Sequence, residues 1–274
     1  MKSINFFIKN QINRSEFKIC FTLLNFLSVF GMIIGYMQNY KNDFMFLRSA
    51  ADNFFLTSTD ARVARMLFVF LFPLMAASFG TCYSGKNNKE SNGFYALFRM
   101  NKKLFVYGNA VVVVCTAIVG FVIVLGLNQF MCILTYPLEG YDNRWGMAPY
   151  RLIESFQPDL LFDIWTIQNP YVYNILYILM ISIMAGGIAL LSYSLGFMKE
   201  IKKWNSIQLS AFVFAIFILL FVAGEFFQFP TISYLSYVEP GHSVNLMQYM
   251  IFIGSLYILG SILTIRGERT YENL

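Results

Sequence analysis

The sequence has little charge, a single histidine and no block of five like charges. Only 13% of its 274 residues are charged, whereas soluble domains carry about 25%. The hydrophobic content of 57% excludes an intrinsically disordered chain, because disorder requires low hydrophobicity. The net charge of +5 is scattered between apolar stretches, so it does not indicate nucleic-acid binding. This composition indicates an integral membrane protein.

Motifs for catalysis and for metal binding are also missing. His242 is the only histidine and the four cysteines show no C-x-x-C spacing, whereas metal ligands come in clusters. Lys86 follows Ser-Gly as in a phosphate-binding loop, but the upstream glycine is absent. We therefore expect no enzyme activity, metal or cofactor in this chain. A membrane enzyme is less favoured, because it would need paired Asp, Ser–His or clustered His within its apolar segments.

Six segments are long and apolar enough to cross a bilayer, which takes about 20 residues. They are 19–37, 65–83, one within 104–138, 170–197, 207–229 and 246–265. The third is long enough to project beyond the bilayer or to bend near Gly120 and Gly126. The sequence thus predicts an all-α membrane protein with six transmembrane helices, built as one domain over residues 1–274.

The distribution of charge predicts the orientation of these helices. The two tails and the loops 84–103 and 198–206 hold 14 Lys or Arg and 5 acidic residues. The segments on the opposite side hold 5 Lys or Arg and 9 acidic residues. Since basic residues favour the cytoplasmic side, we expect both termini to be cytoplasmic.

Residues 1–18 are predicted to form an interfacial helix lying in the cytoplasmic headgroup layer. Apolar residues recur near one helical face of this segment: Ile4, Phe7, Ile8, Ile12 and Phe17. The alternative is a short tail that only continues into the first span.

The loop 84–103 contains a short amphipathic stretch between polar residues. Phe94, Leu97 and Phe98 would share one face at helical spacing, and basic residues follow at the membrane boundary. Such a helix is suited to docking into a groove of a partner protein. A solvated loop is the alternative, but it explains only the basic residues.

Glu225 is the only acidic residue inside a predicted span, close to its outer boundary. A carboxylate inside a membrane is costly and therefore a candidate functional group, although at this depth it could also reach water or pair with Gln228. The following segment, 230–245, is apolar and aromatic for an external loop. We predict that it re-enters the membrane; an interfacial aromatic belt is the alternative.

The order of these features resembles the membrane subunit of bacterial ABC-2-type exporters, including permeases of peptide-antibiotic export and immunity systems. The resemblance centres on residues 66–138, where a span with small residues precedes a Gly-containing polar loop and a long third span. It rests on Pro73, Ala76, Ala77, Lys89, Glu90, Gly93, Phe98, Arg99, Lys102 and Lys103. The chain departs from the family at Asn109, a neutral residue where a basic one is frequent, and in its long loop 139–169.

The resemblance implies a transmembrane subunit of an ATP-driven exporter in the bacterial plasma membrane. Residues that couple to a separate ATPase subunit would be Gly93, Phe94, Leu97, Phe98 and Arg99. ATP and Mg²⁺ would bind that partner, and a second permease subunit would complete the complex. Walls rich in Phe, Met and Leu suggest an amphipathic substrate, either a peptide or a lipid-like molecule. The alternative function is a non-transporting immunity or sensor protein that binds a peptide directly.

Overall fold

The structure is a computed structural model that describes residues 2–41, 47–58, 60–81, 102–139, 161–162, 165, 168–198, 201, 204–239 and 244–272. Six of its helices are long and apolar enough to cross a membrane. They are α2 (Ser15–Asn39), α3 (Arg62–Gly80), α6 (Lys102–Thr135), α9 (Pro170–Leu195), α10 (Ser206–Phe226) and α12 (Leu246–Glu272). The predicted fold class, an all-α membrane protein with six transmembrane helices, is confirmed.

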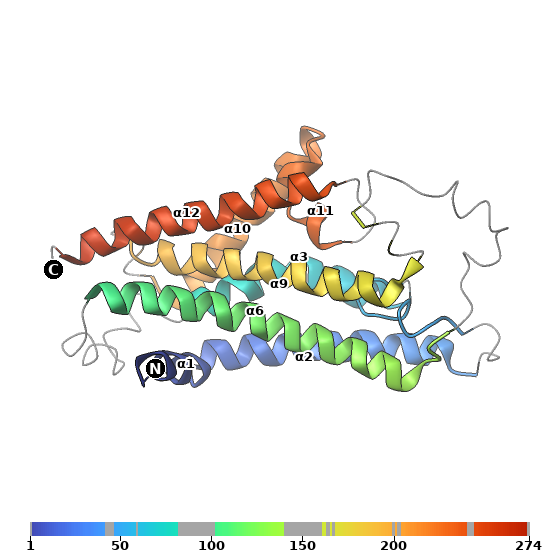
Figure 1. Ribbon diagram of the computed structural model, residues 1–274. Coiled ribbons are helices and arrows are strands. Elements are labelled where there is room, and N and C mark those ends of the chain that lie inside the picture. Colours follow the sequence, from blue (N-terminus) through green and yellow to red (C-terminus); the bar gives the residue numbers. More distant parts are fainter. Residues whose placement is uncertain are drawn as a thin grey trace.

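The chain also contains three shorter helices: α1 (Lys2–Ile12), the 3₁₀ helix η3 (Pro230–Ile232) and α11 (Leu235–Val238). Both termini lie at one end of the bundle, at the left of Figure 1. We call this the terminal end and the opposite one the far end. The charge distribution predicts that the terminal end faces the cytoplasm.

The ends of several helices follow from local sequence signals. α10 and α12 each begin with an Asn-x-x-Gln capping box, in which the backbone N–H of the Asn donates to the Gln side chain. These boxes are formed by Asn205 with Gln208 and by Asn245 with Gln248. α9 begins at Pro170, where a proline costs no hydrogen bond.

The third span is one continuous helix. Its 34 residues correspond to a length of about 50 Å, so α6 exceeds the thickness of a bilayer core and does not break at Gly120 or Gly126. Gly120 instead allows close packing, because a Cβ there would lie 3.1 Å from the ring of Phe79.

α9 is the central helix of the bundle. It packs against α6, α12 and α3, and Figure 1 shows it running between α12 and α6. Its small residues Ser182, Ala185 and Gly186 are all buried. A Cβ on Gly186 would lie 2.7 Å from the hydroxyl of Tyr257 and 2.8 Å from the side chain of Ile118. The small residues therefore let α12 and α6 approach α9 closely.

Phenylalanine rings connect α3 and α6 along the bundle. The centroid of the Phe121 ring lies 5.4 Å from Phe72, 5.9 Å from Phe79 and 6.4 Å from Phe68. Phe68 continues the contact to Phe55 at 5.4 Å. Tilted and edge-to-face contacts of this kind add to the energy of burial, so part of the high Phe content is explained by the interior.

α1 is separate from α2, because the backbone is extended at Arg14 (φ −72°, ψ 144°). Figure 1 shows α1 close to end-on, whereas α2 lies along the bundle. Phe7 of α1 is buried against Phe105 of α6, with ring centroids 5.8 Å apart. α2 already begins at Ser15, so the last residues of the predicted 1–18 segment belong to α2. The position of α1 in the headgroup layer stays a prediction.

Candidate functional site: a cavity between α2, α3 and α10

A cavity of about 700 Å³ lies near the terminal end of the bundle, between the start of α2, the end of α3 and the start of α10; we call the part nearest the terminal end its mouth. Known ligand pockets have volumes of about 300–1,000 Å³. The lining residues are Ser15, Glu16, Ile19, Cys20, Leu23, Leu74, Met75, Ser78, Thr81, Asn205, Ser206, Ile207, Ser210 and Ala211. Half of them are polar and half apolar, so the wall suits a ligand that has both characters.

The polar and apolar residues lie at different depths. Glu16 and Thr81 lie at the ends of α2 and α3 that open toward the terminal end. Leu23 and Leu74 lie seven residues further into these helices, a distance of about 10 Å along each axis. Polarity therefore decreases from the mouth of the cavity toward its depth.

The carboxylate of Glu16 joins α2 to α10. The hydroxyl of Ser206 donates to one of its oxygens at 2.8 Å, and that of Ser15 donates to the other at 3.2 Å. Glu16 also lies in the first turn of α2, where a negative charge interacts favourably with the helix dipole. These contacts hold the carboxylate at the cavity wall.

Hydroxyl groups join α10 to α3 on the other side of the cavity. Ser78 donates to the hydroxyl of Ser210 at 3.2 Å, and Thr81 lies 3.2 Å from the same hydroxyl. Ser210 in turn donates to the backbone carbonyl of Ser206 at 2.9 Å. The three helices are thus connected through polar groups at the cavity mouth, whereas apolar contacts dominate deeper inside.

The residues predicted to couple to an ATPase, Gly93, Phe94, Leu97, Phe98 and Arg99, lie outside the described residues. Thr81, which lines the cavity, stands only three residues before the predicted loop 84–103. The coupling assignment therefore stays a prediction, and the cavity is adjacent in sequence to the start of this loop.

Glu225 occupies the penultimate position of α10 at the far end of the bundle, where its side chain is exposed. It lies at the opposite end of α10 from the cavity. An exposed position at a helix end allows the carboxylate to reach water, so its involvement in function also stays a prediction.

The far end contains a segment that sequence reasoning missed. Residues 47–58 form turns without regular structure, yet Phe54, Phe55 and Leu56 are completely buried. Buried irregular backbone needs hydrogen-bond partners, because unpaired peptide groups are costly away from water. Side chains of the spanning helices supply these partners.

Three amide side chains of α6 and α9 bind the backbone of segment 47–58. Asn128 accepts from the N–H of Phe55 at 3.0 Å and donates to the carbonyl of Ser28 at 3.0 Å. Gln129 donates to the carbonyl of Ala50 at 3.2 Å. Asn174 donates to the carbonyl of Ala51 at 2.9 Å and to the side chain of Gln129 at 2.8 Å. The Asn-Gln pair within an otherwise apolar run was the signal that could have revealed this site.

Arg65 connects segment 47–58 to the predicted re-entrant segment 230–245. Its guanidinium donates to the carbonyls of Leu56 and Ser58 at 3.3 and 3.4 Å, and it pairs with Glu239 at 3.7 Å. Both charged groups are mostly buried. One side chain of α3 therefore holds two loops together at the far end.

Residues 230–239 fold back onto the bundle through η3 and α11. Tyr234, Tyr237 and Val238 are buried in the main core, as expected of residues that turn back toward the interior. Whether this segment enters the membrane stays a prediction.

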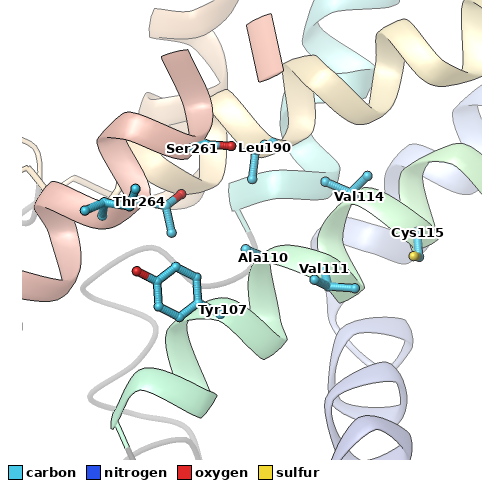
Figure 2. Close-up of a pocket in the computed structure, with 9 residues that line it drawn as sticks. Tyr107, Ala110, Val111, Val114, Cys115, Leu190, Ser261 and Thr264 are labelled. Atoms are coloured by element: carbon cyan, nitrogen blue, oxygen red, sulfur yellow. The ribbon is translucent and has the colours of Figure 1, made fainter. Parts of the chain in front are cut away.

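A second, smaller cavity of about 300 Å³ lies between α6, α9 and α12 (Figure 2). Its wall is almost entirely apolar, and the hydroxyl of Tyr107 at one side donates to Glu268 at 2.6 Å. Cys115 is exposed here. An apolar thiol on α6 is compatible with the lipid that would surround this helix.

A comparison with known protein families, curated proteins and solved structures finds no match for this chain. Within the described residues, no group of three or more His, Cys, Asp or Glu side chains is arranged to hold a metal ion. The cavity between α2, α3 and α10 is therefore the candidate functional site on its geometry and chemistry.

Proposed function

We propose that this chain is the transmembrane subunit of an ATP-driven bacterial exporter that moves an amphipathic substrate, either a peptide or a lipid-like molecule. The observation that carries the proposal is the cavity at the terminal end, whose wall is polar at the mouth and apolar inside. A substrate with a polar head and an apolar body would enter it in one orientation.

The position of the cavity supports a mechanism driven from outside the chain. Ser78 and Thr81 of α3 contact Ser210 of α10, and the loop 84–103 follows α3 directly. A partner that moved this loop would shift the end of α3 relative to α10, and so change the shape of the cavity. ATP would thereby stabilise one of two arrangements without binding to this chain.

The exposed faces of α2 and α10 support a further subunit. Only 28% of the most apolar window of each helix is buried within the chain, and the cavity lies between them. A second permease subunit, identical or related, would cover these faces; lipid would cover the rest.

Affinity purification tests the proposal. The full chain should co-purify with a separate ATPase, and replacing Phe94, Leu97 and Phe98 together by Ser should abolish this association while leaving membrane insertion intact. The matched control replaces three exposed aromatic residues at the far end by Ser: Phe226, Phe227 and Phe229. Complex formation that survives the first triple change would refute the coupling assignment.

The alternative function, a non-transporting immunity or sensor protein, would use the same cavity to bind a peptide. It predicts that no ATPase co-purifies in repeated experiments.

Glu225→Gln is expected to reduce transport if the carboxylate takes part in export, and unchanged transport would assign it a structural role.

A further inference from the structure

We propose that the smaller cavity, the groove between α6, α9 and α12, holds one acyl chain of a bilayer phospholipid as a bound ligand. The groove has a volume of about 300 Å³ (Figure 2) and shares no lining residue with the cavity between α2, α3 and α10. This lipid stays bound to the chain, so it is distinct from the exported substrate.

The groove exists because α6 and α12 are held apart. Both helices pack extensively on α9, whereas they have little contact with each other. Leu190 of α9 is buried and lines the groove between them. The walls carry small residues, Ala110 on α6 and Ser261 on α12, so the side chains of the two helices do not fill the space.

The groove is continuous with the outer surface of the bundle. Val111 of α6 and Ile265 of α12 line it and are 62% and 44% exposed. Because both helices are long and apolar enough to cross a membrane, the medium on this side is the hydrocarbon of the bilayer. An empty groove would leave its lining without van der Waals partners, and an acyl chain supplies them.

The size and chemistry of the groove favour an acyl chain over a helix or a polar ligand. A helix with its side chains is about 10–12 Å across, so less than one turn of it would fill this volume. An acyl chain is a single row of methylene groups. The hydroxyls of Tyr107 and Thr264 already donate to Glu268 and to the carbonyl of Gly260, so the wall offers a polar ligand little to bind.

Polar groups at one end of the groove set the orientation of the lipid. The carboxylate of Glu268 accepts from the hydroxyl of Tyr107 at 2.6 Å and pairs with Lys103 at 3.5 Å. Charged groups lie at the level of the headgroups, because the hydrocarbon excludes them. The headgroup therefore lies beside Glu268, and the acyl chain runs along α6 from Tyr107 toward Cys115, a distance of about 12 Å.

Native mass spectrometry of the full chain, washed in dodecyl maltoside, tests this site. The wild-type chain should retain one phospholipid, and Ser261→Phe, which places a ring in the groove, should lose it. The matched control Ser255→Phe makes the same change at an exposed position of α12 that does not line the groove, and it should retain the lipid. Retention by Ser261→Phe, or loss from both variants, would overturn the proposal.

A second measurement needs no substitution. The chain is reconstituted in nanodiscs of phosphatidylcholine that carries a diazirine on one acyl chain, and the residues labelled on illumination are mapped. A bound acyl chain should concentrate the label on residues 107–115 and 261–265. Equal labelling of Val119 and Ile258, which are exposed outside the groove, would show only freely exchanging lipid and would also overturn the proposal.

Other occupants would give different masses. A second copy of the chain in the groove would appear as a dimer that Ser261→Phe dissociates, and an adventitious additive only would appear as bound dodecyl maltoside without phospholipid. Either result would reject the lipid site. Neither measurement needs an ATPase, so a failure here leaves the proposed exporter in place, and a failure to co-purify an ATPase leaves the lipid site in place.

Discussion

Replacing Gly80 by alanine tests how closely α3 and α9 cross. A Cβ at this position would overlap the backbone carbonyl oxygen of Ala189 and lie 2.9 Å from the Cβ of Ser192. Because the carbonyl belongs to the backbone of the central helix, it cannot rotate away as a side chain could. Overpacking costs about 1–3 kcal/mol and occasionally more, and we expect Gly80→Ala to lower the free energy of unfolding by about 3 kcal/mol.

The matched control is Gly126→Ala in α6. No atom lies within 4 Å of a Cβ at this position, so the only expected effect is the higher helix propensity of alanine, a gain of about 0.5–1 kcal/mol. The two variants make the same chemical change and should differ by about 4 kcal/mol in the free energy of unfolding.

Equilibrium unfolding in mixed micelles of dodecyl maltoside and sodium dodecyl sulfate, followed by circular dichroism, gives this difference. Equal free energies of unfolding for Gly80→Ala and Gly126→Ala would refute the close crossing of α3 and α9. Co-purification with the proposed ATPase is a second readout, and the Gly126→Ala variant should still co-purify with it.

Two further predictions concern polar groups inside the bundle. Asn128→Leu leaves the buried N–H of Phe55 unpaired and should destabilise the chain by about 2 kcal/mol, measured as faster hydrogen exchange of residues 47–58. The control Asn109→Leu replaces a buried amide without a hydrogen-bond partner among the described residues and should be neutral or stabilising. Equal losses of stability in the two variants would contradict the assignment of Asn128. Arg65→Met should accelerate hydrogen exchange in both 47–58 and 230–239, whereas Glu239→Gln should accelerate it mainly in 230–239. If both segments stay protected from exchange in the Arg65→Met variant, Arg65 does not connect them.

The six spans could be predicted because each needs only a long apolar run, a property of local composition. The starts of α10 and α12 also follow from local signals, the capping boxes at Asn205 and Asn245. What could not be predicted is which helix lies in the centre. α9 is apolar on all sides, but α10 is equally apolar and lies at the periphery, so hydropathy does not distinguish protein neighbours from lipid.

Segment 47–58 was missed for a related reason. Its own polar residues Arg48, Asp52 and Asn53 are typical of a solvated loop, whereas its burial depends on amide side chains about 70 and 120 positions later in the chain. In the N-terminal helix, Gln11 is buried and donates to the carbonyl of Phe79 at 3.0 Å, whereas Ile12 is 44% exposed. The periodicity of the sequence could not show that Gln11 packs into the bundle, because its partner Phe79 lies 68 residues away.

The candidate site was also outside the reach of sequence reasoning. Glu16 lies within a stretch that we interpreted as part of an interfacial helix, and its partner Ser206 is 190 residues away. Neither residue belongs to a recognisable motif. α2 and α10 both pack against α3, and this arrangement brings the carboxylate and the hydroxyl together.

The central place of α9 has a consequence for biogenesis. A ribosome synthesises α3 and α6 before α9, so these two helices enter the bilayer before their main packing partner exists. α3 and α6 have only modest contact with each other and extensive contact with α9. A chain truncated before Pro170 would keep the contacts of α2 with α3 and α6, but it would lack the helix against which both α3 and α6 pack most extensively.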